Sequence, residues 1–167
     1  MPTRIVNGKK QRYDYFLIWG HGLPYLEQIL QMIQGDATLK IIDVRRFRPR
    51  NLPRFVNEIY SCDYAPREHL KAKTEYLMTL PVNDVVVVFV LNTGVQEVMR
   101  GEGAFRHPEC DRIKRLKDAI RNRFNPRIDG KRSEWHVVHA SDSEAQTSRL
   151  YRYLQFVAGR EPAAAAV

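Results

Sequence analysis

Apolar residues follow one another without interruption over residues 85–91, the longest such run in the chain. A run without polar alternation is typical of a strand that is covered on both faces, so we expect it at the centre of a sheet. Residues 13–19 and 39–47 are rich in β-branched and aromatic residues, and residues 135–139 form a shorter segment of the same kind. The pattern therefore predicts four strands.

Helical spacing of apolar residues appears between these strands. Pro24 fits the first position of a helix that Gly35 ends, and residues 111–124 form a charged amphipathic helix. Residues 51–78 carry two helical stretches that Pro66 separates, and residues 141–143 can cap a last helix. The polar residues 125–134 are expected to form a loop.

The order of these elements predicts the fold class. With the helical pair at 51–78 set aside, the chain reads β-α-β-β-α-β, which is the α+β, ferredoxin-like plan of an antiparallel sheet with helices on one face. We expect a basic N-terminal extension at 1–12, a single domain at 13–159 and a flexible tail at 160–167.

Composition narrows the classes of partner. The 167 residues include 27 Lys and Arg against 19 Asp and Glu, a formal net charge of +8. This surplus raises the chance of a polyanionic partner, and its densest part lies between Lys114 and Arg132. Nucleic acid is possible but not favoured, because both candidate central strands lack the aromatic motif of ferredoxin-like RNA-binding domains. No apolar run approaches the roughly 20 residues of a membrane span, so we expect a cytoplasmic protein without a membrane partner.

The segment His139-Ala140-Ser141-Asp142-Ser143 carries the candidate chemistry. It lies where a predicted strand meets a helix N-terminus, which favours bound phosphate, and a histidine there can act as a nucleophile. The alternative is that a serine only caps the helix while His139 is structural. His136 and His139 are three residues apart, which places them on opposite faces of a strand, so no shared metal site is expected.

This segment resembles the His-Gly-Ser-Asp-Ser motif of the nucleoside diphosphate kinase family. Residues 15–23 look like that family's first strand and its turn into the first helix, and residues 119–124 are similar to its Thr-Ile-Arg-Gly-Asp-Phe motif. The order and spacing of elements match over roughly residues 13–156.

The resemblance implies a function and its residues. In the family, the matching histidine takes the γ-phosphate of a nucleoside triphosphate and passes it to a diphosphate with the help of Mg²⁺. By resemblance, His139 is the nucleophile, Ser141 assists it, and Arg121 binds phosphate, with Arg106 as a second phosphate contact. The resemblance also implies a homo-oligomer.

Four positions depart from the family's pattern. Trp19 stands where the family has a phosphate-binding lysine, and His136 where it has an asparagine that contacts the sugar. Leu150 replaces an orienting glutamate, and Leu70 lies near the place of a phenylalanine that stacks on the base. His21 or Lys73 would have to replace the missing lysine. A nucleotide-binding module without transfer activity is therefore the alternative hypothesis, and a nucleic-acid-binding protein is the third.

Overall fold

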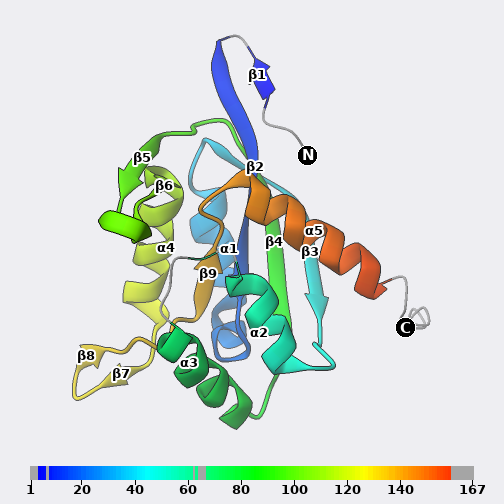
Figure 1. Ribbon diagram of the computed structural model, residues 1–167, viewed down its shortest axis with the longest axis vertical. Helices are drawn as coiled ribbons and strands as arrows, with labels where there is room; N and C mark the ends of the chain where they lie inside the picture. The colour runs from blue at the N-terminus through cyan, green and yellow to red at the C-terminus, as the bar shows by residue number, and fades with distance from the viewer. Residues whose placement is uncertain (1–3, 7, 62, 64–66, 159–167) are drawn as a thin grey trace.

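An antiparallel sheet forms the centre of the computed structural model, which describes residues 4–6, 8–61, 63 and 67–158 (Figure 1). Strand β2 (Lys9–Ile18) pairs with β4 (Val85–Asn92), and β4 pairs with β3 (Leu39–Phe47). On its other edge, β2 pairs with β9 (Val138–Ala140) near Ile18 and with β1 (Arg4–Val6) near Lys9. The strand order β9-β2-β4-β3 is that of the ferredoxin-like fold, as the element order predicts.

Helices cover both faces of this sheet. On one face lie α1 (Leu26–Gln34) and α4 (Asp111–Phe124). On the other lie α2 (Leu52–Tyr60), α3 (Arg67–Thr79) and α5 (Glu144–Ala158). The two helices of the predicted ferredoxin-like plan, α1 and α4, lie on one face as expected, while the inserted pair and the last helix add a second layer on the other face. Two apolar clusters follow, and the side chains of β4 alternate between them, which explains its uninterrupted apolar run.

Several boundaries differ from the predicted ones. Strand β2 begins at Lys9, so part of the expected N-terminal extension pairs with β1 in a hairpin that projects from the sheet (Figure 1). The first helix is preceded by the 3₁₀ turn Gly20–Tyr25, and β9 begins only at Val138. The last strand is short because residues 134–136 form a bend that brings the chain to the cavity described below.

The structure contains two hairpins that the sequence pattern does not predict. Strands β5 (Glu97–Arg100) and β6 (His107–Cys110) enclose the 3₁₀ turn Gly103–Phe105, and β7 (Arg127–Ile128) pairs with β8 (Lys131–Arg132) within the expected loop. The predicted tail at 160–167 lies outside the described residues.

None of the helices in the described part of the chain combines the length and the apolar character that crossing a membrane requires.

Candidate functional site

A cavity of about 460 Å³ lies where α3, α4 and the segment around β9 meet. Its lining mixes acidic, basic and aromatic side chains, and it includes four of the residues to which the resemblance assigns a position in the family's site. Those four are His139, Arg121, His136 and Leu70. The other lining residues are Tyr60, Asp63, His69, Ala72, Lys73, Glu109, Lys117, Glu134, Trp135 and Asp142.

His139 lies in β9 with its imidazole almost completely buried. Its ring contacts those of Tyr60 and Tyr15, at centroid distances of 4.7 and 6.0 Å. Burial, followed by the positive charges of Lys117 and Arg121, holds the pKa of His139 well below its ordinary value. The ring is therefore neutral at physiological pH, and a neutral imidazole keeps the lone pair that a nucleophile needs.

Lys73 supplies a buried amine next to this histidine. Its Nζ lies over the rings of Trp19 and Tyr60, 5.4 and 6.0 Å from their centroids, and donates a hydrogen bond of 3.3 Å to the carbonyl of His136. Burial, with the positive charge of Arg121 as a second cause, lowers the pKa of Lys73 to about 7. Trp19 itself is buried below Lys73 in an apolar cluster and is not among the lining residues.

The cations of the cavity differ in their partners. Lys117 is paired, with its Nζ 3.3 Å from Glu109 Oε1 and 3.5 Å from Asp142 Oδ1. Arg121 instead donates from Nε to the carbonyl of Val138 at 3.1 Å. Within the described residues, no carboxylate lies within 4.0 Å of a charged nitrogen of Arg121 or Lys73. These two cations are therefore available to an anionic ligand.

His136 also lines the cavity, which corrects the expectation that it and His139 face opposite sides. It precedes β9, so the alternation of a strand does not apply to it. The side-chain amide of Asn125 lies 2.8 Å from His136 Nδ1, and Glu134 Oε2 lies 3.2 Å from Nε2. Burial, aided by Arg121, lowers the pKa of His136 to about 3, so Nδ1 accepts from Asn125 and Nε2 carries the proton.

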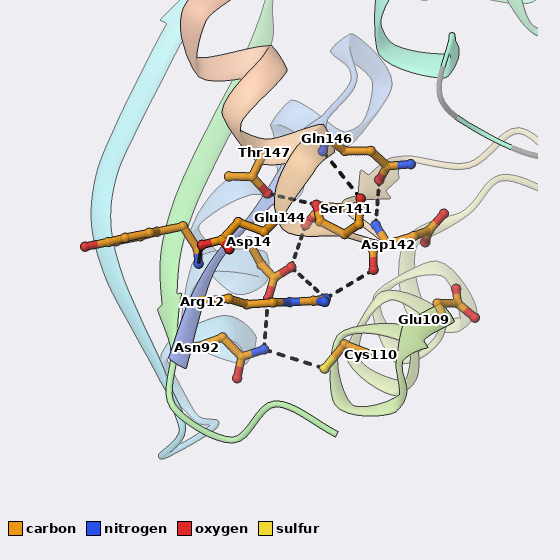
Figure 2. Close-up of polar contacts among 12 residues, drawn as sticks. Arg12, Asp14, Asn92, Glu109, Cys110, Ser141, Asp142, Glu144, Gln146 and Thr147 are labelled. Carbon is orange, nitrogen blue, oxygen red and sulfur yellow. Dashed lines mark hydrogen bonds and ion pairs between the residues drawn. The ribbon is translucent and has the colours of Figure 1, made fainter. Parts of the chain in front are cut away.

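Ser141 belongs to a buried network beside the cavity rather than to its lining (Figure 2). Its hydroxyl donates to Asp14 Oδ1 at 2.8 Å and accepts from the backbone N–H of Tyr15 at 3.1 Å. Asp14 also accepts from Arg12 and from Asn92, at 3.0 and 2.9 Å. Because its hydroxyl both donates and accepts a hydrogen bond, Ser141 fixes the junction of β9 and α5, and thereby the chain that follows His139.

The remaining candidate residues do not line the cavity. Arg106 is exposed after the 3₁₀ turn and is not a lining residue. Leu150 is buried in the apolar cluster under α5, so this helix supplies no carboxylate at that position. His21 Nε2 lies 3.1 Å from the carbonyl of Trp135, and its ring packs against Tyr76. Of the two replacements considered for the missing lysine, only Lys73 reaches the cavity.

Carboxylates gather at one side of the cavity. Glu109 and Asp142, together with His107, offer ligand atoms within 4.8 Å of one another, a grouping that can hold a metal ion. Carboxylate oxygens are the ligands that Mg²⁺ prefers, so Glu109 and Asp142 fit this ion. In the structure, Lys117 pairs with both of them, and Arg100 also pairs with Glu109.

Sequence reasoning missed Lys117, Glu109 and Asp63 as parts of this site. Lys117 has the spacing of the apolar positions Ile113 and Ile120 on α4, which is the signal that would have marked it as inward-facing. Glu109 and Asp63 lie in segments without a periodic pattern, so no signal of this kind exists for them.

Comparison with known proteins bears on the fold. No protein-family model and no curated protein matches the sequence. Among solved structures, the nucleoside diphosphate kinase of Aquifex aeolicus is similar, with a TM-score of 0.54 and 18% identity over 86% of this chain and 94% of that one. The Borrelia burgdorferi enzyme, solved with vanadate and ADP as a transition state mimic, has a TM-score of 0.46 and 14% identity, covering 83% of each chain. The chain therefore has an α+β fold like that of the Aquifex aeolicus nucleoside diphosphate kinase.

Proposed function

We propose that the protein transfers a phosphoryl group between nucleoside phosphates through His139. One observation carries the proposal: a neutral, buried imidazole shares a cavity with two cations, Lys73 and Arg121, that have no carboxylate partner among the described residues. A buried cation without a counter-charge is costly, so such a site favours an anionic ligand. The arrangement places that ligand beside a nucleophile.

The proposed reaction has two balanced halves. The lone pair of the imidazole attacks the γ-phosphorus of a nucleoside triphosphate, and the bond from this phosphorus to the bridging oxygen breaks. The diphosphate leaves with the electron pair. In the second half, a terminal oxygen of another nucleoside diphosphate attacks the same phosphorus, the N–P bond breaks, and neutral His139 returns. Arg121 and Lys73 would hold the non-bridging oxygens, where charge accumulates.

The two cavities and their carboxylates also suggest where the metal ion, the sugar and the base of the nucleotide bind. Glu109 and Asp142 would hold a Mg²⁺ ion that arrives with the phosphates and offsets their negative charge. A second cavity of about 720 Å³ lies between α2 and α3, and Tyr60, Asp63 and Leu70 line both cavities. We expect the sugar and base to extend past Leu70 into this second space. A homo-oligomer and a cytoplasmic location remain predictions.

Labelling with a γ-labelled nucleoside triphosphate and Mg²⁺ tests the proposal. The expected result is an acid-labile, base-stable label that maps to His139 and is absent from a His139→Gln variant. Arg121→Ala should slow labelling, whereas Arg123→Ala should not, because Arg123 is an exposed neighbour on the same helix. Absence of label with a range of triphosphates would contradict the proposal.

A nucleotide-binding module without transfer is the second candidate. The burial of Trp19 and Leu150 in apolar surroundings favours it, because each stands where the resembled family has a charged residue. Calorimetric binding of a nucleoside triphosphate without any labelling of His139 would establish this candidate and exclude the first.

The basic stretch of α4 gives less support to a nucleic-acid partner. Lys114 pairs with Asp118, and Arg115 with Asp111, so much of this charge is already neutralised. This hypothesis requires that the protein bind nucleic acid and that its affinity decrease steeply as the salt concentration increases.

A further inference from the structure

The carboxylate beside His139 comes from Asp63, which lies between α2 and α3. Asp63 Oδ2 is 3.8 Å from His139 Nε2. This nitrogen is buried, and no atom of the described residues forms a hydrogen bond with it. The distance exceeds that of a hydrogen bond, but contacts of this kind are often long in ligand-free proteins and tighten when substrate binds.

Gln146 on α5 holds Asp63 in this position. Its Nε2 donates to Asp63 Oδ1 at 3.0 Å, and its Oε1 accepts from the backbone N–H of Asp142 at 2.6 Å. A backbone N–H can only donate, so the orientation of the Gln146 amide is fixed. The amide therefore occupies Oδ1 of Asp63 and leaves Oδ2 for the histidine.

We propose that Asp63 is the positioning residue for His139 and that Gln146 holds Asp63 in place. The carboxylate accepts the proton of Nε2–H in a hydrogen bond, which leaves the lone pair on Nδ1. When the N–P bond forms, the ring becomes cationic and keeps its proton on Nε2, beside the negative charge of Asp63. When the N–P bond breaks, the ring is neutral again, so Asp63 gains no proton.

This inference rests on the proposed function of His139, and it concerns a residue outside the family's pattern. The resembled family orients its histidine from the last helix, where this chain has Leu150 in an apolar cluster. Here the last helix contributes Gln146, and the carboxylate comes from Asp63, between α2 and α3.

The charge of Asp63 depends on the groups that face it. Burial, with the negative charge of Asp142 next, raises the pKa of Asp63 to about 7, while the positive charges of Lys117, His107 and Arg121 oppose this rise. The carboxylate is therefore mostly ionised at pH 8, where its effect on His139 can be measured.

The tautomer of His139 provides the test, by long-range ¹H–¹⁵N correlation on the full chain at pH 8. We expect the Nε2–H form in the wild type. In Asp63→Asn, Gln146 still donates to the remaining oxygen, so the new amide points its N–H at Nε2 and reverses the tautomer to Nδ1–H. Phosphorylation by phosphoramidate, a donor that needs no nucleotide site, should then fall by up to about 10⁴-fold.

The matched control is Asp129→Asn, because Asp129 lies in an exposed turn with a φ of 49°, which asparagine accepts readily. It should leave tautomer and phosphorylation unchanged. An Nδ1–H form in the wild type overturns the inference whether or not the variant folds, and so does an unchanged tautomer or phosphorylation rate in Asp63→Asn. If both tautomers are as expected but the wild type is never phosphorylated, the proposed function is refuted while the role of Asp63 in positioning His139 stands.

Discussion

Lys73 and Trp19 are in contact, and the sequence resemblance sets Trp19 where the family has a lysine. The tryptophan fills the space at the end of β2 with an apolar ring, and the amine of Lys73 lies over this ring from α3. The amine of Lys73 thus lines the cavity from α3. Lysine carries its charge at the end of a flexible stem, which lets the amine reach the cavity from this helix.

Replacement of Lys73 by methionine should weaken binding of a nucleoside triphosphate by about 10- to 100-fold, because a hydrogen bond to a charged group contributes roughly 1.5–3 kcal/mol. Methionine keeps the packing against Trp19 and removes the charge. Lys40→Met is the control, since Lys40 is exposed on β3 and lines neither of the two cavities. Isothermal titration calorimetry measures both, and equal losses in the two variants would contradict the assigned role of Lys73.

The pKa of Lys73, about 7, predicts that phosphate binding takes up a proton above neutral pH. A bound phosphate raises the pKa of the amine, so the amine gains a proton when the ligand binds at pH 8. Affinity should therefore decrease as the pH rises from 7 to 9. Calorimetry in two buffers of different ionisation enthalpy counts the protons, and an uptake that persists in Lys73→Met would assign it to another group.

At the scale of elements, the junction of β9 and α5 depends on the buried carboxylate of Asp14. It accepts from Arg12 on its own strand, from Asn92 at the end of β4 and from Ser141 after β9 (Figure 2). This one side chain therefore ties together three segments of the chain. The position of His139 follows from this tie, because the histidine is two residues before Ser141.

Asp14→Ala should lower the free energy of unfolding by about 3–5 kcal/mol, since it leaves the buried guanidinium of Arg12 without its closest partner. Asp43→Ala removes a half-exposed partner of Arg45 on β3 and should cost less than about 1 kcal/mol. Urea denaturation followed by circular dichroism compares the two. Similar losses would show that the network around Asp14 contributes little stability.

Elements with a strong local pattern could be predicted from the sequence. The apolar run of β4 and the amphipathic pattern of α4 are confirmed nearly to the residue. Strands β5 and β6 could not be predicted from the sequence, because β5 is largely exposed and β6 contains Pro108. Their pairing with each other stabilises them, and a pairing partner cannot be identified from the alternation within one segment.

The residues of the candidate site could likewise be predicted only in part from the sequence. His139 and Arg121 could be identified by their motifs, and both line the cavity. Ser141 is in the motif, but its neighbour Asp14 is more than a hundred residues away in the sequence, so its role in the network became visible only in the fold. Asp63 and Gln146 depend on the packing of α2 against α5, which local sequence does not specify.

Over the whole molecule, one buried and two partly buried histidines predict a loss of stability in mild acid. The pKa values of His21 and His136 fall to about 4 and about 3, mainly through burial, and that of His139 lies well below its usual value. Because these folded-state values lie below the unfolded value of about 6.5, the three groups stabilise the fold above pH 6.5. This contribution is lost as the pH falls towards 4.

Asp63 acts in the opposite direction, because its raised pKa makes the fold gain stability as the pH falls from about 7 to 3.8. The stability that the fold gains from Asp63 as the pH falls offsets about the loss from one histidine. We therefore expect a net loss on the order of 1–2 kcal/mol per pH unit between pH 6.5 and 4.5, after allowance for partial exposure of His21 and His136. Urea unfolding at a series of pH values measures it, and constant stability over this range would disprove the neutral state of these histidines.

The proposed transfer of a phosphoryl group to and from His139 can be measured by intact-protein mass spectrometry at basic pH. After incubation with a nucleoside triphosphate and Mg²⁺, the wild-type chain should gain the mass of one phosphoryl group and lose it again when a nucleoside diphosphate is added. His139→Gln should gain nothing. A wild-type mass that stays unchanged with every triphosphate, or an equal gain in His139→Gln, would show that His139 does not carry the phosphoryl group.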